Sequence, residues 1–421
     1  MKIPRVLQDP DLRKKIFWVL AILAVFRLAA SIPVPGVNPD ALRAFFAQNQ
    51  FFNLLNLFSG GGLENLSIVM LGVGPYITAS IIMQLFTIIF PKLKEMHEES
   101  GEQGRAKFNQ YTRYLTVPLA FLQAFGLIKL LSRQGVFGET TTFSFITNLV
   151  VVVAGTLFLM WLGEIISEYK IGNGISLLIF AGIVARLPRE ILNLALSFNV
   201  SQLPYIIGFV LIGLLVIAAV VFVTEGERDI PVSYAKRVRG TRMYGGISTH
   251  LPLRVNQAGV IPIIFALSII LLPGMIATFL SAAKFETLAK IASSLANLFN
   301  RQSFYGGLYF ILVVVFTYFY TAIAFDPKKI SENIQKQGGF IPGIRPGSHT
   351  VDYLYKIVNR ITLVGAIFLG LIAILPFIVQ TFTKISTITI GGTSLLIVVS
   401  VVLETIKQIE AQMVMREYDT V

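Results

Sequence analysis

The chain has 421 residues, of which 54% are hydrophobic and only 14% are charged, and its formal net charge is +12. Soluble proteins carry about 25% charged residues, so this composition excludes an ordinary soluble domain. Cysteine is absent, which excludes disulfides and thiolate metal sites. The three histidines lie in polar connecting segments, and no metal-binding motif surrounds His97, His250 or His349.

The first apolar segment follows a basic N-terminus, in the order that a signal peptide has. However, its apolar run is long, and the following "IPVPGVNPD" is a poor site for signal peptidase. We therefore interpret the segment as a retained first span. Its helix should stop near Pro33 and Pro35, because proline interrupts a helix.

Apolar runs near 20 residues recur along the whole chain, and this length crosses about 30 Å of hydrocarbon. They predict an all-α polytopic membrane protein. The fifth run is the weakest, because its uninterrupted apolar core is only Ile175 to Ala185. The ten candidate spans are 16–35, 68–90, 114–131, 147–167, 175–194, 204–224, 257–280, 304–325, 357–379 and 387–406.

Basic residues set the orientation of these spans. Most of the 35 lysines and arginines fall on the side of the membrane that both termini share. Basic residues accumulate on the cytoplasmic side because they resist translocation, so both termini are expected in the cytoplasm. This bias explains the net positive charge without a nucleic-acid ligand.

Two cytoplasmic loops, 225–256 and 326–356, are longer than a helix connection requires. Both contain glycine, proline and basic residues, and Tyr234, Tyr244 and Phe340 add aromatic side chains. A solvated surface near anionic lipid headgroups would account for the charge. It would not account for the length, which favours a docking platform for a large cytosolic partner. An RNA-containing partner is one candidate, since arginine and lysine suit phosphate contacts.

The interiors of the candidate spans contain no acidic residue. Arg27 lies near the outer end of the first span, and Glu164 and Glu404 lie at cytoplasmic ends. Secondary transporters place ionisable groups near the midplane, so a small-solute transporter is disfavoured. A non-conducting scaffold that recruits ribosomes is a third hypothesis, which leaves the glycine-rich segment before residue 68 unexplained.

Small and polar residues instead gather at the beginnings of several spans, in "GVGPYITAS", "IGNGIS", "NQAGVIP" and "GGTS". Small residues let helices approach closely, and such surfaces can also part as a gate. With "NLFSGG", "QYTRYLT", "FDPKKI" and "GGFIPGIRPG", these motifs resemble the SecY family, the channel-forming subunits of the bacterial Sec translocon. The resemblance runs in order from about residue 5 to residue 417.

The resemblance implies ten helices in two inverted, pseudo-symmetric halves, 1–200 with helices 1–5 and 201–421 with helices 6–10. The polar connector 195–203 would be the hinge. The resemblance further implies that the protein is a protein-conducting channel that has no catalytic activity and no cofactor. Unfolded secretory polypeptides would cross the bacterial cytoplasmic membrane through it, and transmembrane segments would leave it sideways into lipid.

The resemblance also implies an aliphatic ring at mid-membrane, which would seal the channel against ions by dewetting. Two pairs in it have i, i+4 spacing and so share a helical face, Val73 with Ile77 and Ile175 with Ile179. The ring would consist of Val73, Ile77, Ile175, Ile179, Ile264 and Ile397.

A short re-entrant plug helix of about residues 57–69 would close this ring from the outer side. Glycines in it supply conformational freedom, and its polar residues would face a water-filled funnel. The implied plug residues are Phe58, Gly60, Gly61, Gly62, Glu64 and Asn65. The implied lateral gate between helices 2 and 3 and helices 7 and 8 is lined by Thr78, Ile81, Gln123, Ser268 and Leu272.

The long cytoplasmic loops would dock the ribosome or the motor ATPase SecA, and SecE and SecG would be the small membrane subunits. Signal sequences, nascent polypeptides and lipids are the remaining expected partners. Many relatives end in a short basic tail, whereas this chain stops at "MREYDTV". The expected docking residues are Lys236, Arg237, Arg239, Arg242 and Arg345.

Overall fold

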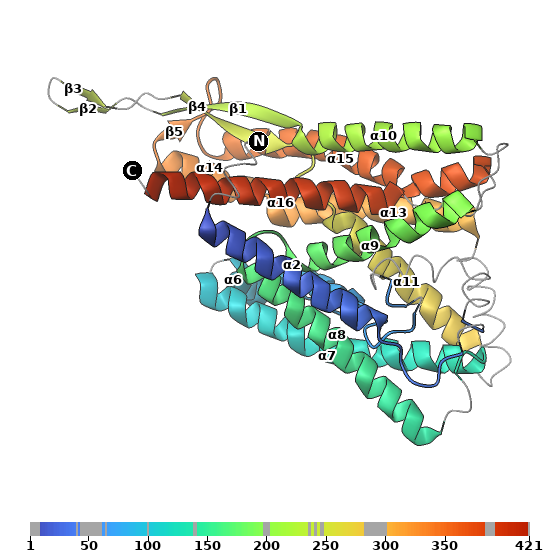
Figure 1. Cartoon of the computed structure of the whole chain (residues 1–421). Helices are drawn as coiled ribbons and strands as arrows, with labels where there is room; N and C mark the ends of the chain where they lie inside the picture. The colour runs from blue at the N-terminus through green and yellow to red at the C-terminus, as the bar shows by residue number, and fades with distance from the viewer. Residues whose placement is uncertain are drawn as a thin grey trace. The chain divides into compact units, whose positions relative to one another are not determined.

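The structure is a computed structural model, and it is predominantly helical, as the apolar runs predict (Figure 1). It describes residues 9–38, 41–42, 61–63, 65–98, 101–137, 141–196, 203–234, 237–239, 242–244, 248–281, 301–383 and 392–419.

Helix α2 (Pro10–Ser31) shows how local sequence sets the ends of the first span. The Asp9 carboxylate accepts a hydrogen bond from the Asp11 amide at 2.9 Å, and proline occupies the first helical position. Both features favour a helix start. The helix ends two residues before Pro33, close to the predicted stop.

Among the described residues, five further helices follow α2 before the predicted hinge. Helix α5 packs on α7, α7 on α8, and α8 on α9. The chain bends by 117° between α5 and α6, at Phe90 and Pro91. These helices are α5 (Gly74–Ile89), α6 (Pro91–Glu98), α7 (Gly101–Arg133), α8 (Thr142–Glu168) and α9 (Gly174–Leu196).

The remaining helices are α10 (Leu203–Glu225), α11 (Ile261–Ser281), α13 (Gln302–Ala324), α14 (Pro327–Lys336), α15 (Ser348–Thr383) and α16 (Gly392–Asp419). Among all the residues that the structure describes, five helices are long and apolar enough to cross a membrane. The number is six if the bent pair of α5 and α6 forms one span. The count of ten spans stays a prediction.

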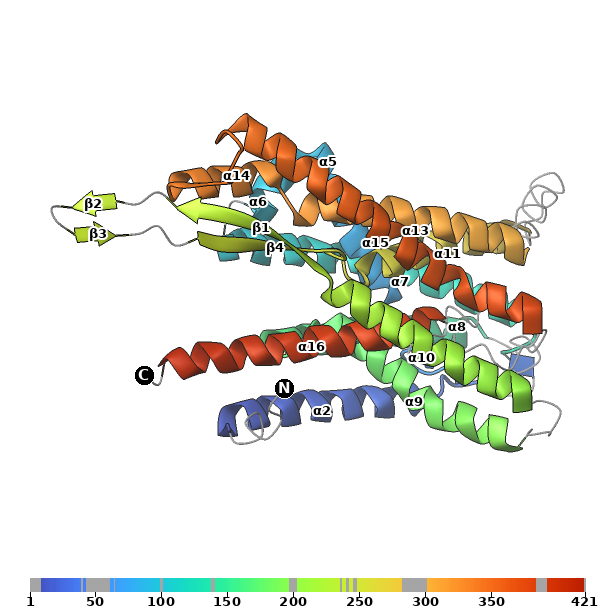
Figure 2. The same cartoon turned by 90° about the horizontal axis from the view of Figure 1, so that it is seen from above.

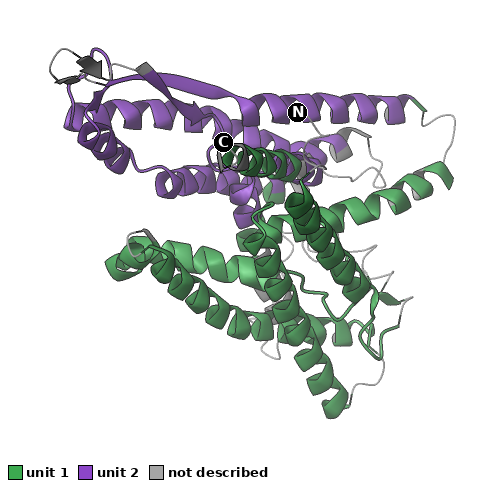
Figure 3. Cartoon of the chain, turned by 60° about the vertical axis from the view of Figure 1, so that its left-hand side comes forward, with its two compact units in different colours: residues 1–203, 267–305, 401–421 green, residues 204–266, 306–400 purple. Residues whose placement is uncertain are grey.

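The chain forms two compact units (Figure 3). The first unit comprises residues 1–203, 267–305 and 401–421, and the second comprises 204–266 and 306–400. Helices α11 and α16 therefore each contribute to both units. The division into halves at residue 200 stays a prediction.

The described part of the second unit contains two small antiparallel sheets that the sequence did not predict. Strand β1 (Glu227–Tyr234) lies between β4 (Ser248–Arg254) and β5 (Gly339–Phe340). Glu227 pairs with Arg254, and Ser233 pairs with both Ser248 and Phe340. Beyond this sheet, β2 (Arg237–Arg239) and β3 (Arg242–Tyr244) form a separate hairpin pair (Figure 2).

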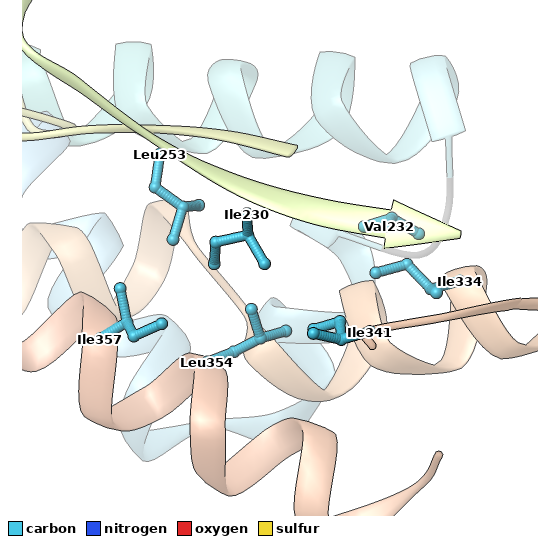
Figure 4. Close-up of a cluster of buried hydrophobic side chains, with 7 residues drawn as sticks. All are labelled: Ile230, Val232, Leu253, Ile334, Ile341, Leu354 and Ile357. Atoms are coloured by element: carbon cyan, nitrogen blue, oxygen red, sulfur yellow. The ribbon is translucent and has the colours of Figure 1, made fainter. Parts of the chain in front are cut away.

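A hydrophobic core lies between the three-stranded sheet, α14 and the first turns of α15. The side chains point toward one another from the sheet on one side and the helices on the other (Figure 4). We call this assembly the sheet subdomain. Its buried residues are Ile230, Val232, Leu253, Ile334, Ile341, Leu354 and Ile357.

The two long loops predicted to form a docking platform therefore fold together into one subdomain. β1 and β4 come from the first loop, whereas β5 and α14 come from the second. The sequence did not reveal this because β5 pairs with β1 across about a hundred residues of chain. Pro231 and Pro252, which strands usually avoid, further weaken the strand pattern.

Truncation of Leu354 tests this core. Leu354 is fully buried, and removing a buried leucine side chain costs about 2–5 kcal/mol. We expect Leu354→Ala to accelerate amide hydrogen exchange in β1 and β4. The neighbouring Tyr355 is 63% exposed, so Tyr355→Ala is the control and should preserve protection. Equal exchange in both variants would show that the core does not hold the sheet.

Candidate functional site

Residues 61–63 and 65–73 form an irregular segment that we call the plug segment. It runs antiparallel to the chain that leaves α2, with a single bridge between Pro33 and Ser67. The Val34 amide donates to the Leu66 carbonyl at 2.8 Å, and the Ile68 amide donates to the Ile32 carbonyl at 3.0 Å. The Leu66 carbonyl and the Ile68 amide form no helical hydrogen bond, and both are thus paired with the extended chain that follows α2.

The plug segment is buried, although it is not a regular helix. Leu66, Val69 and Met70 are fully buried. Among the predicted plug residues, Gly61 and Gly62 are also buried, whereas Asn65 is exposed. The predicted residues Phe58, Gly60 and Glu64 lie outside the described part of the chain.

Glycine is required at the first described position of this segment. Gly61 has a φ of +84°, which disfavours any residue with a Cβ. A Cβ at Gly61 would lie 3.7 Å from the Arg186 side chain and 3.9 Å from Nη1 of Arg27. Two guanidinium-bearing side chains, from α9 and α2, therefore border the start of the plug segment.

Four of the predicted ring residues lie in the first unit. Val73 precedes α5, and its carbonyl accepts the Ile77 amide at 3.0 Å in the first turn. Ile179 on α9 is buried, and Ile175 is half-buried. Each pair lies at the start of its helix, directly after a glycine-containing turn.

The junction of α8 and α9 fixes where Ile175 begins its helix. A Cβ at Gly174 would lie 1.8 Å from the Gly163 carbonyl oxygen, so the two backbones touch. The Ser167 hydroxyl accepts from the Gly174 amide at 2.9 Å and donates to the Gly163 carbonyl at 2.9 Å. One serine thus connects the end of α8 to the start of α9.

The other two predicted ring residues lie in the second unit. Ile264 on α11 and Ile397 on α16 are both buried. That these two meet the four residues of the first unit stays a prediction.

The predicted gate residues lie on three helices. Thr78 and Ile81 are buried on α5, and the Thr78 hydroxyl donates to the Gly74 carbonyl at 3.0 Å. Gln123 is half-buried on α7, and Ser268 is buried on α11. Leu272 lies on α11, and its backbone is described. Their joint role as a gate stays a prediction.

The predicted docking residue Arg345 is exposed in the turn between β5 and α15. Gly343 and Gly347 flank it with φ of +81° and +99°. The buried Thr350 donates to the Arg345 carbonyl at 3.1 Å, and Ser331 donates to the Gly347 carbonyl at 3.2 Å. The turn is therefore fixed to the sheet subdomain, while the arginine side chain faces outward.

The remaining docking residues lie at or near the β2–β3 hairpin. Arg237 pairs with Tyr244, and Arg239 pairs with Arg242. Lys236 lies outside the described residues. The register therefore places Arg237 and Arg239 on one strand and Arg242 on the other, beside Arg239.

The charged residue Glu164 has a structural partner. Its carboxylate accepts from Nε of Arg113 at 2.6 Å, which joins α8 to α7. Within the described ranges, no group of three or more His, Asp or Glu residues could hold a metal ion.

Sequence reasoning did not single out Gly163, Ser167 or Thr350. A glycine inside an apolar helix signals a close backbone approach, but it does not identify the partner. The hydrogen bonds of Ser167 and Thr350 join residues that only the folded chain brings together.

Three comparisons describe what this chain is similar to. A family model described as SecY matches residues 67–406. The protein translocase subunit SecY of Corynebacterium glutamicum is 43% identical over 432 residues, which cover 98% of this chain and 97% of the relative.

Two solved structures share the fold. One, described as a protein-conducting channel, has a TM-score of 0.66 at 20% identity, covering 95% of this chain and 92% of that chain. The other is of a SecY protein whose plug domain is said to stabilise the closed state of the translocation channel and to maintain a membrane seal. It has a TM-score of 0.64 at 20% identity, with 95% and 92% covered.

The backbone contact at Gly174 generates a prediction about stability. Gly174→Ala forces α9 away from α8, and such overpacking costs about 1–3 kcal/mol. We expect a lower melting temperature for the purified protein in detergent. Gly213 on α10 has open space around its Cβ position, so Gly213→Ala is the control and should not lower it. An unchanged melting temperature for Gly174→Ala would contradict the tight junction.

Proposed function

This chain belongs to the SecY family, and from that premise we propose that it is the channel-forming subunit of a protein translocase. It conducts unfolded secretory polypeptides across the bacterial cytoplasmic membrane and releases transmembrane segments sideways into lipid. The observation that carries the proposal is the plug segment. Irregular backbone at membrane depth persists only where protein buries it or where it lines a cavity, and residues 65–73 are non-helical and largely buried.

The proposed seal is the aliphatic ring of Val73, Ile77, Ile175, Ile179, Ile264 and Ile397. Such side chains offer no ligands to replace the hydration shell of an ion, so a narrow ring excludes ions by dewetting. The same flexible side chains can surround a polypeptide of any sequence. The burial of five of these residues and the half-burial of Ile175 support this role.

The proposed lateral gate opens by partitioning. A signal sequence with ten leucine-like residues gains roughly 3–6 kcal/mol on entering lipid. Shifting a two-state equilibrium from 1:99 to 99:1 requires about 5.5 kcal/mol. A signal sequence that partitions into lipid through the gate therefore supplies more than half of the free energy of such a shift and helps to open the gate.

The chain needs no catalytic residue for this task, and we propose that it is not an enzyme. The driving force comes from translation by a bound ribosome or from the motor ATPase SecA. Both bind the cytoplasmic face, and both termini of the chain lie on that side. The exposed Arg345 and the arginine positions of the β2–β3 hairpin suit phosphate and carboxylate contacts. SecE and SecG complete the complex in the membrane.

Single-cysteine crosslinking tests the path of the polypeptide. The chain contains no cysteine, so each introduced thiol is unique. We expect cysteines at Ile77, Ile179 and Ile264 to crosslink to an arrested translocating chain, because all three line the proposed ring. Leu215 on α10 is 69% exposed, and Leu215→Cys is the lipid-facing control. Equal or stronger crosslinking at the control would remove these residues from the path.

Charge reversal tests the docking surface. Arg345→Glu replaces a charge-assisted hydrogen bond worth about 1.5–3 kcal/mol with repulsion, so SecA-driven translocation should fall by about tenfold or more. Arg228 is also exposed in the sheet subdomain, and Arg228→Glu should translocate normally. Normal translocation by Arg345→Glu, at equal membrane levels, would argue against docking at this turn.

A further inference from the structure

We propose that Gly155 of α8 is a positioning residue for the plug segment and determines how stably the channel stays closed. The inference rests on the proposed function, because it assigns a new residue to the closed state of that channel. Two observations support it. One is the contact between Gly155 and the Ile68 carbonyl. The other is a pair of unfavourable features in the plug segment when it is docked, that is, when it lies against α8 as observed.

The Ile68 carbonyl occupies the space where a side chain at position 155 would be. A Cβ built at Gly155 would lie 2.0 Å from the Ile68 carbonyl oxygen and 2.8 Å from its carbon. The partner is backbone, which cannot turn away as a flexible side chain can. Only glycine at position 155 therefore allows the plug segment to reach its observed position on α8.

Helix α8 also supports the chain to which the plug segment is hydrogen-bonded. The buried Asn148 donates to the Pro35 carbonyl at 3.3 Å, in the segment that leaves α2. That same segment pairs with the plug segment at Pro33 and Ser67. Asn148 and Gly155 lie two helical turns apart, so one helix holds the plug segment both directly and through its partner strand.

The docked segment carries two unfavourable features at adjacent residues. Ser67 is fully buried, and its hydroxyl has no hydrogen-bond partner among the residues that the structure describes. Leu66 has a φ of +42°, in the left-handed region that residues with a Cβ rarely adopt. An unpaired buried hydroxyl and a left-handed leucine both raise the free energy of the docked state.

These features act in opposite directions. The contact at Gly155 permits docking, whereas Ser67 and Leu66 limit how stable the docked state becomes. The balance suits a segment that must close the channel at rest and leave when a polypeptide enters. It predicts that changes at Gly155 and Ser67 have effects of opposite sign.

The first test measures ion conductance of the full-length channel complex in planar bilayers, without a translocating polypeptide. Gly155→Ala should raise the undocked population, and therefore the leak, about tenfold, because overpacking forces the plug segment outward. Ser67→Ala removes the unpaired hydroxyl and should lower the spontaneous opening frequency by about tenfold. Gly126 on α7 has open space at its Cβ position, so Gly126→Ala should conduct like the unmodified channel.

A linker variant shows whether Gly155 acts through the plug segment. Replacing residues 61–69 with a short Gly-Ser linker should itself produce a leak. Adding Gly155→Ala to this variant should then change nothing, because the group that the new Cβ would strike is gone. A purely structural role for Gly155 predicts an additional leak instead.

A crosslink provides a measurement that does not depend on conductance. Residues bridged in an antiparallel pair have Cα atoms about 4.5–5.5 Å apart, a separation that a disulfide can span. Pro33→Cys with Ser67→Cys should therefore form a disulfide under mild oxidation when the plug segment is docked. Gly155→Ala should slow that reaction by about tenfold, and Gly126→Ala should not.

The outcomes separate this inference from the proposed function. If the linker variant leaks but Gly155→Ala neither leaks nor slows the crosslink, the role of Gly155 is wrong and the channel stands. An additional leak from Gly155→Ala in the linker background also overturns it. If the linker variant itself does not leak, the sealing role in the proposed function fails, and the inference fails with it.

Discussion

The first unit depends on how closely α8 lets other backbone approach it. Gly155 contacts the Ile68 carbonyl, and Gly163 contacts Gly174 at the start of α9. The first contact needs glycine on α8, and the second needs glycine at position 174, where α9 begins. They set the positions of the plug segment and of Ile175 and Ile179. In a bilayer, where lipid is as apolar as the side chains, close backbone packing replaces the hydrophobic effect as the main source of helix association.

The sheet subdomain is stabilised by a different interaction from the helices of the first unit. It lies outside the apolar spans, so water is its solvent and apolar burial drives its folding. Its core unites two loops that are distant in sequence, and Leu354 and Ile357 place the first turns of α15 inside that core. Because α15 continues to Thr383 without a break in its helix, the subdomain that presents Arg345 is joined directly to a membrane helix.

Helix α16 links the two units within one continuous element. Residues up to 400 belong to the second unit and residues from 401 onward to the first. In its final turns, Gln412 donates to the Lys170 carbonyl and accepts from Nζ of Lys15 at 3.4 Å. The C-terminal part of the helix is thereby held on α2 and on the turn between α8 and α9.

The sequence by itself determined the class of protein, the approximate positions of most spans and the family, because hydrocarbon thickness and backbone hydrogen bonding impose long apolar runs on any membrane helix. It also indicated that residues of about 57–69 are not an ordinary span, since their glycines and polar residues break the pattern. Only the tertiary structure decided what those residues contact. The partner of Gly155, the unpaired hydroxyl of Ser67 and the joining of two loops into one core all depend on residues far apart in the chain. Local sequence patterns do not identify such pairs, because a close contact depends on two segments at once. The pattern of one segment does not specify which distant segment packs against it.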